Sequence, residues 1–354
     1  KPTQITNIIA TLPGDLPADL QRYIVISGHY DSRCTDVTNA IHDAPGADDD
    51  GSAVASVIEI ARVMAPLHFH ATIVFMCVAG EEEGLYGSKY ASGQDKANGW
   101  PIEAMLNNDI IGSSTGGNGV HDSRSVRVFC EGLPPTPTNA QTALIAATGG
   151  ENDSAPRELG RFIRRTAKEY VRRMNVTLVY RRDRYRRGGD QNSFLDLGYP
   201  AVRFTESNED YRHQHQDVRV EGGVQYGDLP QFLDYGYMAN VARINAASLA
   251  VLALAPDVPQ KAELVVRGMT NGTPLQWVGR ADPNVAGYEI VWRATTAPEW
   301  TNSRFVGNVT SCMLPDLSKD DYVFGICAVD REGHMSPAAF PQPFVPPAPP
   351  KTGR

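Results

Sequence analysis

Hydrophobic and polar positions follow two alternating patterns over the first two thirds of the chain. Residues 22–27 and 71–79 are short apolar runs typical of buried strands, and residues 52–64 carry apolar side chains at helical spacing. The same analysis predicts further strands at 102–110, 126–130, 176–180 and 201–204, and helices at 84–91, 159–173 and 235–252. Strands that alternate with helices predict an α/β domain, with a largely parallel sheet covered by helices on both faces.

The pattern changes at a proline-bearing stretch, residues 256–260, which we interpret as a linker. Beyond it, short strands with turn signals and no helix predict an all-β sandwich. We therefore expect an α/β domain over 1–255, the linker, a β-sandwich over 261–345 and a proline-rich tail over 346–354. The sandwich resembles a fibronectin type III domain in residues 275–277 (LQW), 287–290 (GYEI) and 322–324 (YVF).

Composition narrows the classes of function. The 354 residues, 42% of them hydrophobic, are enough for an enzyme domain with a companion domain. The apolar runs are shorter than the roughly 18 residues typical of a membrane span. A net charge of −8 argues against nucleic acid as the main partner. The chain begins at Lys1 without a signal peptide and reaches its strand pattern within a few residues, so we expect a processed or trimmed chain.

Histidine and carboxylate residues gather directly after predicted strands. The segments that contain them are residues 28–32, 45–51, 79–84, 107–109 and 213–217. In open α/β sheets the carboxyl ends of the strands form the edge where ligands bind. Imidazole and carboxylate groups are typical zinc ligands, and one carboxylate can bridge two ions about 3.5–4 Å apart.

Each of these segments alone could be an acidic loop that caps a helix. Asp48 to Asp50, directly before the helix predicted at 52–64, suit that role well. When all five segments meet at one sheet edge, however, so many carboxylates would repel one another unless a cation were bound. The sequence therefore predicts a metal site.

Residues 7–252 resemble the zinc-dependent exopeptidases of the bacterial leucyl aminopeptidase and aminopeptidase Y type, in the order, spacing and flanking glycines of these motifs. The resemblance implies the zinc exopeptidase fold, a mixed, mostly parallel twisted sheet flanked by helices, and two Zn2+ ions per chain. It implies that Glu81 is the general base and that Asp31 orients a ligand histidine. The implied metal ligands are His29, Asp49 as the bridge, Glu82, Asp109 and His213.

Two assignments within the resemblance involve a choice between neighbours. The glutamates at 81–83 could be aligned one residue later, but Gly84 and Gly87 favour Glu81 and Glu82. His213 and His215 compete for one ligand position. The family pattern of His, three residues and Asp selects His213 with Asp217, which leaves His215 as a neighbour.

The substrate pocket is less well defined by the sequence. Relatives often carry Ser-Asp-His where this chain has Gly189, Asp190 and Gln191, so the role of Asp190 stays open. A tyrosine that stabilises the oxyanion aligns with Arg186, and Tyr185 lies one residue earlier. The arginines at 181–187 are either solvated surface or a site for a substrate carboxylate.

The expected function is that of an aminopeptidase that hydrolyses peptides with a zinc-bridging water and Glu81 as base. The resemblance also implies a secreted or periplasmic enzyme. Three alternatives stay open: a carboxypeptidase-type relative that uses the arginines, a glutaminyl cyclase with a single zinc, and a binding module without catalysis.

Overall fold

The computed structural model describes residues 3–267 and 270–345. The chain divides into two compact units, residues 1–253 and 254–354. The predicted tail at 346–354 lies outside the described residues.

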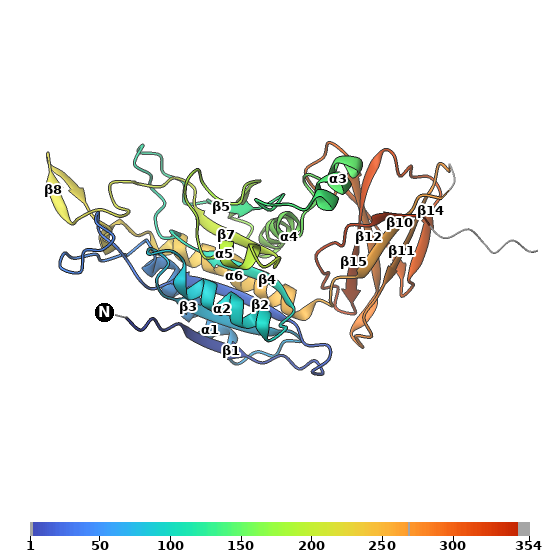
Figure 1. Ribbon diagram of the computed structural model, residues 1–354, viewed down its shortest axis with the longest axis horizontal. Coiled ribbons are helices and arrows are strands. Elements are labelled where there is room, and N and C mark those ends of the chain that lie inside the picture. The colour runs from blue at the N-terminus through green and yellow to red at the C-terminus, as the bar shows by residue number, and fades with distance from the viewer. Residues whose placement is uncertain (1–2, 268–269, 346–354) are drawn as a thin grey trace, which may run out of the picture. The chain divides into compact units, whose positions relative to one another are not determined.

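A seven-stranded sheet forms the centre of the N-terminal unit (Figure 1). Its spatial order is β1-β3-β2-β4-β7-β5-β6, from β1 (Ile8–Leu12), β2 (Tyr23–His29), β3 (Thr72–Val78), β4 (Ile102–Asn108), β5 (Ser125–Cys130), β6 (Asn175–Val179) and β7 (Ala201–Glu206). Strands β3, β2, β4 and β7 are parallel, whereas β1 and β5 pair antiparallel with their neighbours β3 and β7. The predicted mixed, mostly parallel sheet flanked by helices is confirmed.

Helices cover both faces of this sheet. Successive side chains of β4 point to opposite faces of the sheet. Asn107 forms a hydrogen bond with Gln191 of α5 (Gln191–Leu195) on one face, and Asn108 forms hydrogen bonds with Asn245 of α6 (Tyr235–Leu254) on the other. Helix α1 (Gly51–Met64) packs on β2 and β3, and α4 (Ala155–Tyr170) packs on β5 and β6. Helix α2 (Tyr86–Ala97) contacts α5, and Ala91 joins the core formed with Val25 and Met105.

Some elements carry weak sequence signals and were not predicted. Strand β1 lies at the sheet edge with most of its residues exposed, so it lacks a long apolar run. Helix α3 (Asn139–Thr148) buries no residue and begins at a capping box formed by Thr138 and Gln141. The short hairpin of β8 (Arg219–Glu221) and β9 (Val224–Tyr226) also buries no residue fully. These elements bury too little surface to produce a clear hydrophobic pattern.

Helix α6 is the one helix in residues 3–267 and 270–345 that is long and apolar enough to cross a membrane by length and composition. Half of its most apolar stretch is buried inside the protein, including Tyr237, Val241 and Ile244. A core helix of a folded domain meets the same criterion.

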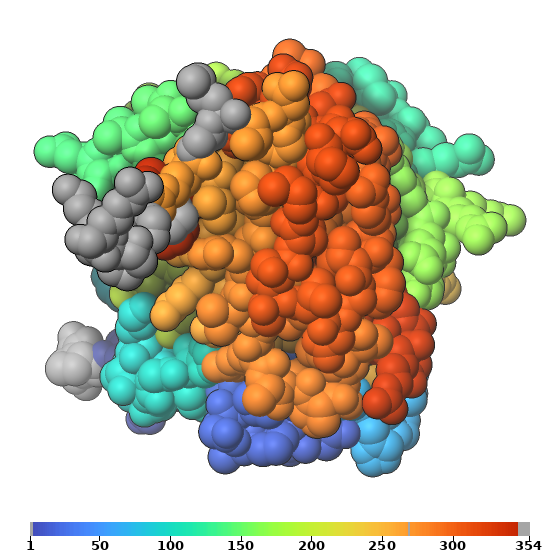
Figure 2. All heavy atoms as spheres, turned by 90° about the vertical axis from the view of Figure 1, so that its right-hand side faces the viewer, coloured from blue at the N-terminus to red at the C-terminus, as the bar shows by residue number. Residues whose placement is uncertain are grey.

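The C-terminal unit contains two β-sheets, whose strands are drawn in Figure 1. Its atoms are the orange to red spheres of Figure 2. One sheet has the order β14-β11-β10-β16, from β10 (Gln260–Val265), β11 (Thr273–Val278), β14 (Ser311–Leu314) and β16 (Gln342–Phe344). The other has the order β13-β12-β15, from β12 (Val285–Ala294), β13 (Asn302–Gly307) and β15 (Tyr322–Asp330). Their core contains Trp277, Tyr288 and Phe324, and the Trp277 and Tyr288 rings meet edge to face at 5.2 Å.

Candidate metal centre

The predicted metal-ligating segments meet at the carboxyl ends of the parallel strands. His29 ends β2, Glu81 and Glu82 follow β3, and Asp109 follows β4. Asp49 precedes α1, which begins beside the end of β2. The sheet topology therefore brings together residues that are far apart in the sequence, such as His29 and His215, which are 186 positions apart.

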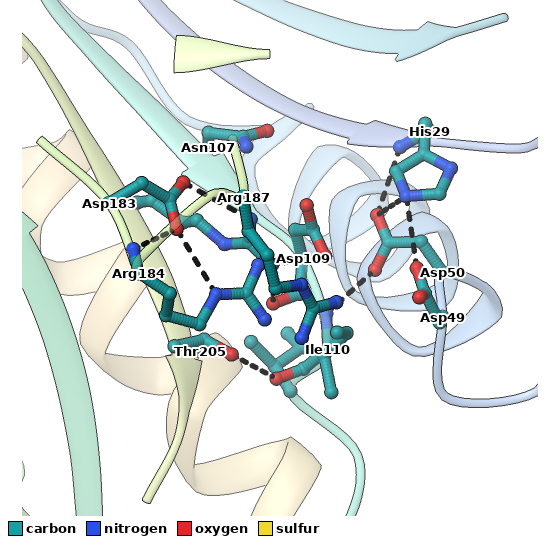
Figure 3. A network of polar contacts seen from close by, with 12 residues as sticks. His29, Asp49, Asp50, Asn107, Asp109, Ile110, Asp183, Arg184, Arg187 and Thr205 are labelled. Carbon is teal, nitrogen blue, oxygen red and sulfur yellow. Dashed lines mark hydrogen bonds and ion pairs between the residues drawn. The ribbon is translucent and has the colours of Figure 1, made fainter. Parts of the chain in front are cut away.

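The first cluster contains His29, Asp50 and Asp109. One ligand atom from each of these residues lies within 4.8 Å of the others. All three side chains are buried, and the imidazole Nε2 of His29 lies 3.2 Å from Oδ1 of Asp49 (Figure 3). His29 and Asp109 are therefore placed together as predicted, with Asp49 alongside them.

The second cluster contains Asp49, Glu82 and His215, again with ligand atoms within 4.8 Å of one another. The Nε2 of His215 lies 2.8 Å from Oε1 of Glu82 and 3.0 Å from Oδ2 of Asp49. The two oxygens of Asp49 thus face two different imidazoles, one in each cluster. This is the arrangement that a bridging carboxylate requires.

The choice of His213 as a ligand is wrong in this structure, because His215 occupies that place. The ring of His213 instead stacks on Phe232 with the centroids 3.7 Å apart, and its Nε2 lies 3.6 Å from Asp210. The backbone of His215 has a left-handed conformation with φ of 55°, which turns the local chain direction. A spacing pattern read from the sequence does not reveal such a turn.

Asp31 contacts both clusters. Its backbone carbonyl oxygen lies 3.0 Å from Nδ1 of His29, while its carboxylate lies farther from that nitrogen, at 3.8 Å. The same carboxylate accepts a hydrogen bond from the backbone N–H of Glu82 at 3.1 Å. Asp31 therefore holds the imidazole of His29 through its main chain and positions Glu82 through its side chain.

From the sequence, Asp50 was considered as a helix cap and not as a metal ligand, yet it belongs to the first cluster. Its carboxylate accepts hydrogen bonds from the backbone N–H groups of His29 at 2.9 Å and Ile110 at 3.2 Å (Figure 3). These bonds join the end of β2, the residues after β4 and the start of α1. The sequence feature that could have identified Asp50 is its position as the last aspartate before a predicted helix.

The donor atoms fit zinc. When Nδ1 of His29 donates to the carbonyl of Asp31, Nε2 presents its lone pair towards Asp49, so a cation or a second proton must lie between them. Burial lowers the pKa of His29, but Asp50 and Asp49 raise it well above its ordinary value. Burial also opposes the charge of His215, whereas Asp49 and Glu82 raise its pKa to about 9. Both imidazoles thus face strongly negative surroundings, and two histidines with three carboxylates form a typical zinc donor set.

Glu81 lies at a cavity of about 450 Å³ beside the clusters, together with Asp49, Glu82, Asp109 and His215. The backbone carbonyl of Glu81 accepts hydrogen bonds from the N–H groups of Gly84 and Leu85, which closes a tight turn after β3. Burial raises the pKa of the Glu81 carboxyl well above its ordinary value, and Asp109 adds to that rise. Its place on the cavity wall beside both clusters suits Glu81 to accept and return a proton.

The arginines around the cavity have carboxylate partners that the sequence did not reveal. Arg184 and Arg187 both bind Oε2 of Glu209, at 2.6 and 2.8 Å. Arg203, inside β7, is fully buried and binds Asp109 at 2.6 Å and Asp183 at 3.2 Å. The sequence feature that could have revealed the ion pairs of Arg203 is a charged residue in the middle of an apolar strand, because a buried arginine requires paired carboxylates.

The three predicted substrate residues are placed differently from one another. Arg186 lines the cavity, and no polar partner for it is found among the described residues. Tyr185 is 78% exposed, and Arg181 stacks over its ring at 4.2 Å. Asp190 is fully buried before α5, and burial raises its pKa to about 6. Of these three, Arg186 is the one that the structure places on the cavity wall.

Comparison with known proteins shows which family the chain matches and which proteins it resembles. The model of the family described as "Peptidase family M28" matches residues 7–221. The chain is 49% identical over 348 residues to the "Probable zinc metalloprotease" of Pyricularia oryzae, covering 97% of this chain and 69% of that protein. A protein of the same description from Leptosphaeria maculans is 45% identical over 342 residues, with 97% and 79% covered. Among solved structures, the LapA aminopeptidase of Legionella pneumophila matches with a TM-score of 0.50 and 21% identity, covering 71% of this chain and 56% of that one.

Proposed function

The chain belongs to peptidase family M28, and its relatives are described as probable zinc metalloproteases. From this premise we propose that it is an aminopeptidase that works with two zinc ions. One observation carries the proposal: the carboxylate of Asp49 lies between the imidazoles of His29 and His215, with Glu81 on the wall of the adjoining cavity. His29 and Asp109 would hold one ion, Glu82 and His215 the other, and Asp49 both. Asp50 lies in the first cluster, but its oxygens already accept two backbone hydrogen bonds.

Bound zinc would supply Lewis acidity, which acidifies water and polarises the scissile carbonyl. The side chains perform the proton transfers. Glu81 accepts the proton of the attacking water and returns it to the amine that leaves. Burial raises the pKa of Asp109, and Arg203 opposes that rise through its 2.6 Å contact with the carboxylate.

Charge around the cavity supports removal of N-terminal residues. The wall carries four carboxylates, Asp49, Glu81, Glu82 and Asp109, beside four arginines. Three of these arginines are already paired with carboxylates, so the carboxylates beside the clusters can attract an α-ammonium group. A carboxypeptidase would need a free cation for the α-carboxylate. Arg184, Arg187 and Arg203 are already paired, so Arg186 is the residue that favours this second candidate.

The test uses one peptide in three forms: free, N-acetylated and C-amidated. We expect stepwise loss of N-terminal residues from the free and amidated forms, read by mass spectrometry, and no cleavage of the acetylated form. Glu81→Gln should lower kcat by at least about 10²-fold and retain its zinc. Glu83→Gln is the matched control, because Glu83 is exposed and does not line the cavity.

Other outcomes would overturn the proposal. Cleavage that survives acetylation but stops on amidation identifies a carboxypeptidase, and Arg186→Ala should then abolish it. One zinc at the two clusters, with no cleavage of any form, favours the glutaminyl cyclase. No bound metal favours a binding module.

We propose that the two sheets of the C-terminal unit form a fibronectin type III-like attachment module. Its support is the core of Trp277, Tyr288 and Phe324, enclosed by two sheets whose strands pair antiparallel except for β10 with β16.

A further inference from the structure

A third group of potential metal ligands lies outside the cavity. Among residues 3–267 and 270–345, Cys34, His42 and Asp217 each offer one ligand atom, and these atoms lie within 4.8 Å of one another. Cys34 and His42 come from the loop between β2 and α1, and Asp217 comes from the loop after β7. Cys34 is fully buried, whereas the side chains of His42 and Asp217 are 58% and 39% exposed.

The contacts already present leave these three atoms poorly paired with one another. The Nδ1 of His42 lies 3.7 Å from Oδ1 of Asp217, which is longer than an ordinary hydrogen bond. The thiol of Cys34 donates at 3.5 Å to the backbone carbonyl of Asp36. Asp217 also accepts a bond from the N–H of Thr35 at 3.3 Å, and its own N–H donates to the Thr35 hydroxyl at 3.1 Å. The two loops are therefore held together beside the cluster by Thr35.

The separation of the ligand atoms matches a shared ion. Zinc lies about 2.0–2.2 Å from imidazole nitrogen and carboxylate oxygen, so two such atoms in a tetrahedral site are about 3.4 Å apart. The observed 3.7 Å between His42 and Asp217 is close to this value. A thiolate, an imidazole and a carboxylate are a donor set for zinc, whereas Ca2+ and Mg2+ select oxygen ligands.

We propose that Cys34, His42 and Asp217 form a separate zinc site that fastens the loop between β2 and α1 to the loop that carries His215. Binding releases the thiol proton of Cys34 to solvent. The exposed side of His42 and Asp217 leaves the fourth position to water. Nothing in this proposal depends on the peptidase activity.

The site has a consequence for the metal centre because of its position in the chain. Asp217 lies two residues after His215, whose left-handed backbone conformation persists only when the surrounding structure holds it. The first loop begins after His29 and leads to Asp49. An ion on Cys34, His42 and Asp217 therefore fixes the distance between segments that carry ligands of both clusters.

The test is cobalt substitution of the full chain. Neither cluster of the metal centre contains a cysteine, so a near-ultraviolet thiolate-to-Co2+ absorption band reports the Cys34 site alone. We expect this band in the wild type, its loss in Cys34→Ser, and one metal ion fewer per chain. Cys312→Ser removes a partly exposed thiol in the other unit and should leave the band unchanged.

A second variant covers the possibility that Cys34→Ser fails to fold. His42→Ala changes an exposed side chain, and we expect it to weaken cobalt binding at this site at least tenfold with the circular dichroism spectrum preserved. The absence of the thiolate band in the wild type would overturn the proposal, as would an unchanged metal content in Cys34→Ser. Glu81→Gln should lose peptide hydrolysis but keep the thiolate band. A failure of the proposed peptidase function therefore leaves the band in place, whereas a failure of the Cys34 site removes it.

Discussion

At the scale of single residues, His213 and His215 are close in sequence but lie in different surroundings. His215 contacts Glu82 and Asp49, and His213 stacks on Phe232. We predict that His215→Ala removes one of the two zinc ions held by the two clusters and abolishes peptide hydrolysis. His213→Ala should keep both ions and lose on the order of 1 kcal/mol of stability, because it removes the ring contact with Phe232 and the 3.6 Å contact with Asp210. Metal analysis after dialysis and denaturant unfolding measure the two effects, and loss of zinc in His213→Ala would contradict the structure.

Glu209 provides a second prediction at this scale, because one buried carboxylate binds Arg127, Arg184 and Arg187. Burial opposes its charge, but the arginines lower its pKa from 4.5 to about 2. A lowered pKa stabilises the folded state above pH 4.5, and this contribution disappears as the pH falls from 4.5 to about 2. Glu209→Gln should therefore cost on the order of 3 kcal/mol at pH 7.

The measurement for Glu209 is denaturant unfolding of wild type and Glu209→Gln at several pH values. The difference between them should shrink below pH 4.5 and be absent near pH 2. Glu221→Gln is the control, because Glu221 forms an exposed pair with Arg219 and should change stability by less than about 0.5 kcal/mol. A difference for Glu209→Gln that is independent of pH would show that its effect is not electrostatic.

Most of the metal centre could be predicted from the sequence, and the misplaced part has a physical reason. His29, Asp49, Glu82 and Asp109 follow directly from strand ends or a helix start, where the topology determines position. His215 lies instead in an irregular loop with a positive φ, where spacing does not determine which side chain faces the site. The pairing of the arginines with Glu209 depends on three separate segments, so no local pattern reveals it.

At the scale of elements, the turn between β3 and α2 places both Glu81 and Glu82. Its geometry depends on Gly87, whose N–H donates to the Ala79 carbonyl at 2.8 Å. A β-carbon at Gly87 would lie 2.5 Å from that oxygen and 2.4 Å from Oδ1 of Asn7. The backbone of the turn would have to move to accommodate it.

We predict that Gly87→Ala costs about 1–3 kcal/mol and also lowers kcat, because the displaced turn carries the general base. Gly93→Ala, in the same helix α2, is the matched control. No described atom lies within 4 Å of a β-carbon at Gly93, so this change should stabilise the protein by about 0.5–1 kcal/mol and leave activity unchanged. Thermal unfolding and steady-state kinetics measure both. Equal effects of the two substitutions would show that the close approach at Gly87 is unimportant.

The fold was predictable to the extent that each element buries an apolar face. Strands β2, β3, β4 and β7 are buried, and their apolar runs were visible in the sequence. Helix α3 buries no residue, and the edge strand β1 is mostly exposed, so neither produces a pattern that distinguishes it from a loop.

At the scale of the whole molecule, the N-terminal unit buries many carboxylates at one sheet edge. Burial and mutual repulsion raise the pKa of Asp50 well above its ordinary value, and burial also raises the pKa of Asp109. Unless a cation is bound, this part of the fold is destabilised by uncompensated charge. The metal is then a structural component as well as a catalytic one.

Metal removal should therefore lower the stability of the unit formed by residues 1–253. Zinc at 100 times its Kd contributes about 2.7 kcal/mol, which corresponds to roughly 5–10 °C in Tm for a unit of this size. Calorimetry of the chelated and zinc-reloaded protein measures the shift, and Asp49→Asn should reduce it because Asp49 contacts both imidazoles. If chelation abolished activity without lowering Tm, the buried carboxylates would have to be neutralised by protons instead of zinc, and the stability of the metal-free protein would then fall as the pH rises.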